Sequence, residues 1–284
     1  MVSVQMGASF AKGLFPIIGP YSTVLLRISI AAAILVLIWR PWRQSLGGKW
    51  LNKSSLKALV LYGTCLGLMN MTFYLALTRI PLGICVALEF TGPLAVALLA
   101  SKKKIDFIWA ILAALGICLI LPLKAEQTAL DPIGILLALF AGTCWAFYIV
   151  FGKRVGTMVH GGIASSLGMV IASLVTVPFV ATQIVWSDLT PKILLLGTGV
   201  ALLSSAIPYT IEMFAMKKVP TKTFGILMSL EPAIAALSGL LMLNEKLDST
   251  QWLAIVCVIM ASAGSAKTSK QEQPQSQPPL QTPA

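Results

Sequence analysis

Long stretches without a charged residue constrain this 284-residue chain more than any other feature. Residues 58–78, 132–152 and 193–211 are all uncharged and mostly apolar. A helix that crosses a hydrocarbon core about 30 Å thick requires about 20 such residues. The whole chain is 57% hydrophobic and 11% charged, whereas soluble domains carry about 25% charged residues. The sequence therefore predicts an all-α, polytopic membrane protein.

The apolar blocks between charges and Pro or Gly breaks predict ten transmembrane helices. They are expected near residues 1–15, 21–39, 57–78, 81–101, 105–123, 132–151, 160–182, 191–211, 223–243 and 250–266. The block before Lys12 is too short to span a bilayer, so we expect the reading frame to begin upstream. Residues 267–284 are rich in Pro, Gln and Ser, a composition that predicts a disordered cytoplasmic tail.

The 21 lysines and arginines are distributed unevenly over the predicted loops. Lys12 and Arg27 fall within helices, and with a cytoplasmic N-terminus fifteen of the others fall on the cytoplasmic side. The outer segments carry only Arg79, Lys124, Lys192 and Lys246. This distribution follows the positive-inside rule and predicts that both chain ends are cytoplasmic. The net charge of +11 therefore requires no nucleic-acid partner.

An internal repeat is visible when the chain is aligned with itself. The register that pairs Pro81 with Pro220 also pairs Pro93 with Pro232. We interpret the pairs as a duplication, with a first five-helix repeat over 1–123, whose first helix is incomplete, and a second over 124–266. Because each repeat has an odd number of spans, the two are inverted. Inverted repeats are typical of secondary transporters, whose substrate sites lie at the bilayer midplane between the halves.

Two carboxylates are predicted at membrane depth, where a charge costs several kcal/mol unless it is compensated. Glu89 lies midway along residues 81–101, and Glu231 midway along residues 223–243. The functional interpretation is that they exchange protons or contact a substrate ammonium. The structural alternative is that they hydrogen-bond neighbouring helices and hold the bundle together.

Prolines follow both acids and remove backbone donors inside the predicted helices. The carbonyl of Glu89 loses its partner at Pro93, and that of Ser204 at Pro208. Freed carbonyls at depth are tolerated where neighbours or cavity water satisfy them. The helix breaks expected to shape a wet central cavity are Gly92, Pro93, Ser204, Pro208 and Pro232.

Polar side chains in the same blocks predict a substrate pocket. The neutral candidates are Asn70, Tyr74, Trp145 and Tyr148, although Tyr and Trp also form belts at membrane interfaces. Lys12 and Arg27 could each hold a substrate carboxylate, pair with an acid, or extend to the outer interface. For Arg27 we favour extension to the interface.

No pattern in the sequence points to an enzyme or a cofactor. His160 and the five cysteines lack metal-ligand or redox spacing. Paired aspartates for lipid phosphates, a Ser/His pair and a Gly-Asp protease site are likewise not recognisable. A passive channel would not require inverted halves or midplane acids. We therefore expect a carrier without metal or cofactor, as a monomer or homodimer.

Four segments resemble the threonine/homoserine exporter branch of the EamA-like drug/metabolite transporter superfamily. They are residues 86–97, 142–148, 208–213 and 220–232, and the likeness extends over nearly the whole chain. The resemblance implies a ten-helix carrier in the inner membrane of a bacterial cell that exports small amino acids, with the amino acid and protons as its ligands. The alternative is a carrier of another metabolite or drug in the same superfamily, such as aromatic amino acids, purines or xenobiotics.

Overall fold

The computed structural model describes residues 1–45, 53–100, 105–120, 130–181, 183, 189–208 and 229–268, and these contain helices and no strands. The longer helices are α1 (Val2–Trp39), α3 (Lys53–Leu77), α7 (Pro132–Gly156), α8 (Gly161–Val180) and α13 (Ser249–Thr268). The shorter ones are α2 (Pro41–Ser45), α4 (Leu82–Glu89), α5 (Thr91–Ala100), α6 (Asp106–Ile120), α9 (Pro191–Ala201), η2 (Leu202–Ala206) and α12 (Glu231–Leu243).

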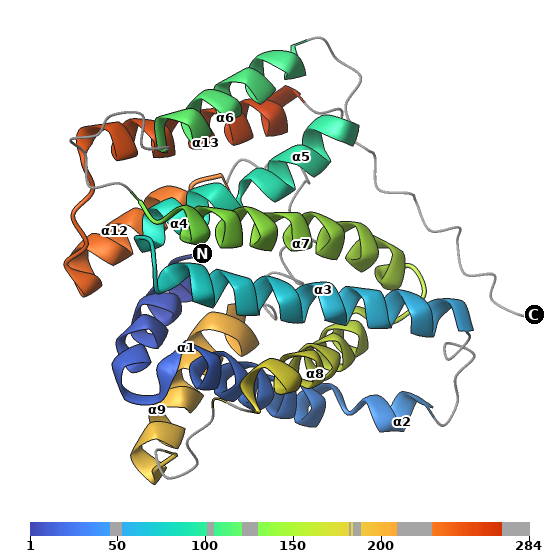
Figure 1. Cartoon of the computed structure of the whole chain (residues 1–284). Helices are drawn as coiled ribbons and strands as arrows, with labels where there is room; N and C mark the ends of the chain where they lie inside the picture. Colours follow the sequence, from blue (N-terminus) through green and yellow to red (C-terminus); the bar gives the residue numbers. More distant parts are fainter. Residues whose placement is uncertain are drawn as a thin grey trace, which may run out of the picture.

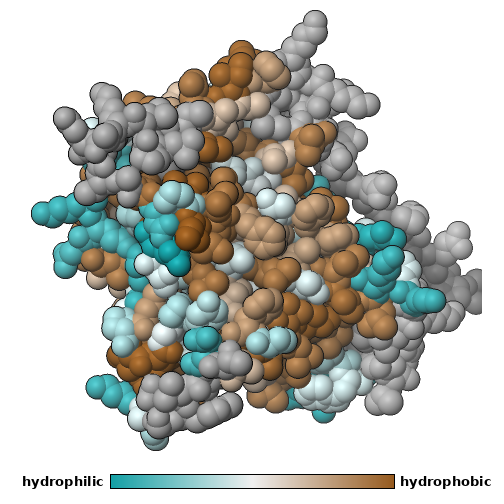
Figure 2. Space-filling view, in the orientation of Figure 1, coloured by the Kyte–Doolittle hydropathy of each residue, from teal (hydrophilic) through white to brown (hydrophobic). Residues whose placement is uncertain are grey.

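The apolar character of these helices confirms the polytopic membrane class. Within the described ranges, five helices are long and apolar enough to cross a bilayer, and four further apolar helices are shorter. The surface in Figure 2 is mostly brown between teal groups at either end of the long helices, as expected for a protein surrounded by lipid. The count of ten helices stays a prediction. Most of the predicted tail and parts of the helices expected over 191–211 and 223–243 lie outside the described residues.

The helices pack in layers (Figure 1). The central helices α3 and α7 lie side by side, and α8 packs against both α3 and α1. At one edge α6 pairs with α13, while α4 packs against α12 and α1 contacts α9 and η2. Segments distant in the sequence are therefore brought together in the middle of the bundle.

A sharp kink divides α1 where two separate helices were predicted. Gly19 has φ 75° and ψ 163°, a conformation that favours glycine. Pro16 and Pro20 flank it within the helix, and each removes a backbone donor. The break therefore lies in the predicted place, but it is a single residue rather than a loop.

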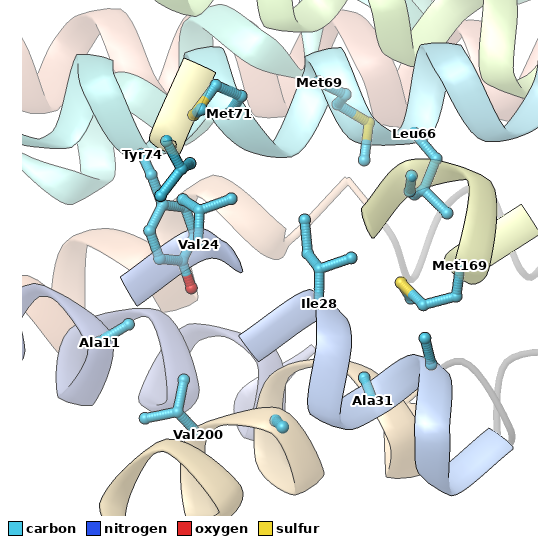
Figure 3. Close-up of a cluster of buried hydrophobic side chains, with 14 of the residues drawn as sticks. Ala11, Val24, Ile28, Ala31, Leu66, Met69, Met71, Tyr74, Met169 and Val200 are labelled. Atoms are coloured by element: carbon cyan, nitrogen blue, oxygen red, sulfur yellow. The ribbon is translucent and has the colours of Figure 1, made fainter. Parts of the chain in front are cut away.

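A buried apolar cluster joins the second part of α1 to α3, α8 and α9. In Figure 3, Val24 and Ile28 of α1 lie among Tyr74 of α3, Met169 of α8 and Val200 of α9. The ring of Tyr74 extends from α3 toward α1. Arg27, which precedes Ile28 in the chain, thus enters a closely packed region.

Candidate functional site

The helix predicted over residues 81–101 is divided into α4 and α5 immediately after Glu89. The Phe90 amide bonds the carbonyl of Val86 at 2.9 Å, and the Leu94 amide bonds the carbonyl of Phe90 at 3.2 Å. The intervening carbonyl, that of Glu89, has no such amide because the fourth residue after it is Pro93. The break therefore begins beside the predicted acid.

The backbone of α7 presses directly against this break. A Cβ on Gly92 would overlap the Gly142 carbonyl, and a Cβ on Gly142 would lie 2.6 Å from the Glu89 carbonyl oxygen. Only glycine fits at both positions, because a side chain on either would separate the two backbones. Trp145, one turn further along α7, meets the ring of Phe90 edge-on at 5.5 Å between centroids. The break is thus held by close contacts from α7.

Two buried carboxylates lie near this break, on opposite halves of the chain. Glu89 on α4 is 7% exposed and Glu231 at the start of α12 is 6% exposed. The helices that carry them, α4 and α12, pack against each other. Oε1 of Glu231 accepts a hydrogen bond from Gln5 Nε2 at 3.0 Å. Oε2 of Glu231 is buried and has no hydrogen-bond partner in the described part of the chain. Pro232 follows within the first turn of α12.

The prediction that Arg27 extends to the outer interface is wrong. Its side chain is 4% exposed and points into the bundle. Nη1 donates to Ser204 Oγ at 3.1 Å and to Ser205 Oγ at 2.9 Å, and Nη2 donates to Asn70 Oδ1. The guanidinium carbon lies 4.8 Å from the centroid of the Tyr74 ring, within the range of a cation–π interaction. Hydrogen-bond acceptors on α3 and η2 hold the side chain inside the bundle. The position of Arg27 in the sequence gave no indication of these acceptors.

The segment opposite Arg27 is a π-helical turn, η2, of a kind often found at functional sites. Pro208 cannot donate to the Ser204 carbonyl, and that oxygen lies 3.5 Å from Arg27 Nη1. The structure therefore brings Asn70, Tyr74 and Ser204, all predicted from the sequence, around a cation for which extension to the interface had been favoured over binding of a substrate carboxylate. Ser205 was missed because only the π-helical turn directs it toward Arg27.

Two of the predicted residues have partners of their own. Tyr148 stacks on Tyr62 at 4.9 Å between ring centroids, and their hydroxyl oxygens are 3.3 Å apart. Lys12 Nζ lies 2.6 Å from Glu245 Oε1 and 3.3 Å from the Ile80 carbonyl oxygen. The polar groups of Tyr148 and Lys12 therefore already have protein partners. Binding of substrate by either residue stays a prediction.

Comparison with known proteins identifies the family of the chain. Residues 132–266 match the EamA-like transporter family. The threonine/homoserine exporter RhtA of Salmonella typhimurium strain LT2 is 46% identical over 272 residues, covering 96% of this chain and 90% of that protein. RhtA of Escherichia coli K12 is 45% identical over the same shares. An uncharacterized transporter of Bacillus subtilis, YwfM, is 25% identical over 206 residues, 70% of each chain.

A solved crystal structure shares the fold. It superimposes with a TM-score of 0.62 at 15% identity and covers 92% of this chain and 93% of its own. The apolar helices and the sequence identity over nearly the full length support the same assignment. This chain is a multi-pass membrane protein that belongs to the EamA-like transporter family, in the branch of the threonine/homoserine exporters.

Proposed function

We propose that this protein exports small amino acids, threonine and homoserine first among them, across the inner membrane. The observation that carries the proposal is the pair of buried carboxylates, Glu89 and Glu231, beside a broken helix. Burial of an uncompensated carboxylate is costly, and a substrate ammonium or a proton would remove that cost. The substrate named for the relatives of 45–46% identity carries such an ammonium group.

The same carboxylates offer a means of coupling export to protons. We propose that Glu89 holds either the substrate ammonium or a proton, but not both. Substrate from the cytoplasm would displace the proton inward, and a proton from outside would displace the substrate outward. Glu231 begins the helix that packs on α4, so its charge would favour cation binding at Glu89. Asn70, Tyr74 and Trp145 would complete the polar wall.

Access from the two sides in turn requires two halves that move against each other. We propose inverted five-helix repeats over 1–123 and 124–266, with both chain ends cytoplasmic. Packing of equivalent helices supports this: α4 faces α12, and α6 faces α13, as a two-fold axis in the membrane plane requires. Likewise α3 packs on α7, the first helix of the other half, as η2 packs on α1.

Efflux of labelled amino acid from preloaded cells tests the proposed substrate. Cells that lack their own exporters should lose labelled threonine and homoserine faster when they express this protein, and should tolerate higher external threonine. Unchanged efflux of both, with new resistance to purines, aromatic amino acids or a xenobiotic, would contradict the proposal and favour the alternative carrier.

A second variant tests the role of Glu89. Glu89→Gln keeps the size of the side chain but can neither carry charge nor exchange a proton, so threonine efflux should fall by at least about tenfold. The matched control is Thr176→Val on α8, a buried residue whose hydroxyl bonds only its own helix. Both variants should reach wild-type levels in the membrane, and full efflux by Glu89→Gln would remove Glu89 from the mechanism.

A further inference from the structure

The Arg27 guanidinium is a buried cation that forms no ion pair with a carboxylate in the described part of the chain. The ion pairs found there are Lys12 with Glu245 and Arg79 with Asp131. The three side chains that accept hydrogen bonds from Arg27, namely Asn70, Ser204 and Ser205, are all neutral. Neutral acceptors satisfy donors but do not balance charge, and an unpaired buried charge costs far more than a paired one. The site therefore favours an anion from outside the protein.

The acceptors around Arg27 are themselves fixed in orientation. Asn70 Nδ2 donates to the Leu66 carbonyl at 2.7 Å, which leaves Oδ1 for Arg27. Ser204 Oγ donates to the Val200 carbonyl at 2.6 Å, which directs its lone pairs toward Arg27. The guanidinium is thus held in one orientation before any ligand arrives, and such preorganisation lowers the entropy lost on binding.

One donor of the guanidinium has no partner in the described part of the chain. Arginine has five N–H donors in a planar fork. Nη1 and Nη2 contact the serines and Asn70, whereas the Nε–H is buried and has no hydrogen-bond partner in the described part of the chain. A planar fork with an unused Nε–H matches the geometry of a carboxylate better than that of any other small anion on an amino acid.

Glu89 is the second buried charged group of the proposed site. The guanidinium carbon of Arg27 lies over the Tyr74 ring of α3. Cys85, one turn before Glu89 on α4, contacts the carbonyl of Phe73, the residue before Tyr74, at 3.9 Å. Arg27 and the helix that carries Glu89 therefore approach neighbouring residues of α3. An amino acid carries the complementary pair, a carboxylate and an ammonium, on one carbon. A site with one buried group of each sign therefore selects zwitterions over amines or simple acids.

From this geometry we infer that Arg27 binds the α-carboxylate of the amino-acid substrate, held in position by Asn70, Ser204 and Ser205, while Glu89 receives the ammonium. This inference rests on the proposed function and adds to it the residue that recognises the carboxylate. A purely structural Arg27 would instead join α1 to α3 and η2 and would contact no ligand.

Binding of two matched ligands separates these roles. Threoninamide keeps the ammonium and side chain of threonine but lacks the carboxylate. Purified wild-type protein in detergent, titrated calorimetrically, should bind threonine at least about tenfold more tightly than threoninamide, because charged hydrogen bonds are lost with the amide. Arg27→Gln should reduce threonine affinity to near that of threoninamide, with little change for threoninamide.

The control is Ser29→Ala, which lies two residues further along α1 and whose hydroxyl contacts Ser173 on α8 at 2.7 Å. It should bind both ligands as the wild type does. If Arg27→Gln does not yield folded protein, Arg27→Lys replaces it, and threonine affinity should then fall severalfold while threoninamide affinity is kept.

The contrary results are distinct. Equal weakening of both ligands by Arg27→Gln, with the preference for threonine retained, would overturn the inference and assign Arg27 a structural role. Unchanged affinity for both in Arg27→Lys would do the same. Failure of the wild type to bind either ligand would instead overturn the proposed function itself.

Discussion

Lys12 and Arg27 are two cations on the same helix, and different groups contact their charges: a carboxylate contacts Lys12, whereas neutral acceptors contact Arg27. The Lys12 ammonium is 2.6 Å from a Glu245 oxygen, and its side chain is 21% exposed. The other oxygen of Glu245 accepts from the Leu82 amide at 2.7 Å, so one carboxylate joins α1, the start of α4 and the end of α12. Arg27 is more deeply buried and has only neutral acceptors among the described residues.

The difference shows why charge at depth is not by itself a sign of a binding site. A cation that forms an ion pair within the protein holds helices together. A cation that is hydrogen-bonded only by neutral groups keeps an unbalanced charge, and this charge favours an anionic ligand.

The largest difference is expected between Arg27→Gln and Lys12→Gln. The first removes the proposed carboxylate contact, so threonine efflux from loaded cells should fall by at least about tenfold. The second removes a fastening contact, and efflux per molecule in the membrane should fall by less than about threefold. Equal losses in the two variants would mean that the two cations do not differ in function.

The Lys12–Glu245 pair should contribute to stability rather than to recognition. A double-mutant cycle with Lys12→Met and Glu245→Gln should give a coupling of about 1–2 kcal/mol, less than the 3–5 kcal/mol lost when a fully buried pair is broken, because both side chains are partly exposed. Chemical denaturation in detergent measures it. Zero coupling would show that the pair does not fasten α1 to α12.

A smaller effect is expected when one acceptor is removed from Arg27. Ser205→Ala deletes the 2.9 Å hydrogen bond to Nη1, and loss of about 0.5–1.5 kcal/mol should lower threonine affinity about two- to tenfold. In an Arg27→Gln background the same change should have little further effect. Ser262→Ala on α13, another buried serine, serves as control, and additive losses in the double variant would contradict the coupling.

The smallest effect is expected at the outer pair Arg79–Asp131. The hydrogen bond from Arg79, at 2.6 Å, and the Ile133 amide hold the pKa of Asp131 below its usual value. A lowered carboxyl pKa stabilises the fold above the ordinary value, and this contribution is lost as pH falls through the lowered pKa. The difference in melting temperature between wild type and Asp131→Asn should therefore be small at neutral pH and disappear when the pH falls below the lowered pKa of Asp131. A difference that grows in acid would contradict the sign.

The helices could be predicted from the sequence because each apolar block carries its own signal. Deviations occur where backbone chemistry intervenes: the kink at Gly19 replaces a loop, and α4 ends at Glu89 within an apolar block. The acids and the polar residues Asn70, Tyr74 and Ser204 were found by their depth.

The partners of the cations could not be predicted in this way. Glu245 and Ser205 approach α1 from the other half of the chain, and a sequence pattern in one helix carries no information about which distant element packs on it. The interface position predicted for Arg27 was wrong for that reason: the acceptors that keep it inside are formed by η2, far along the chain.

Counterflow in proteoliposomes tests most directly whether an amino acid passes through the region between Arg27 and Glu89. Vesicles that contain the purified protein and unlabelled threonine are diluted into labelled threonine, and entry of label is followed. The account predicts transient accumulation of label with wild-type protein and only background entry with Arg27→Gln at equal incorporation. Equal accumulation with both proteins, or none with the wild type, would contradict it.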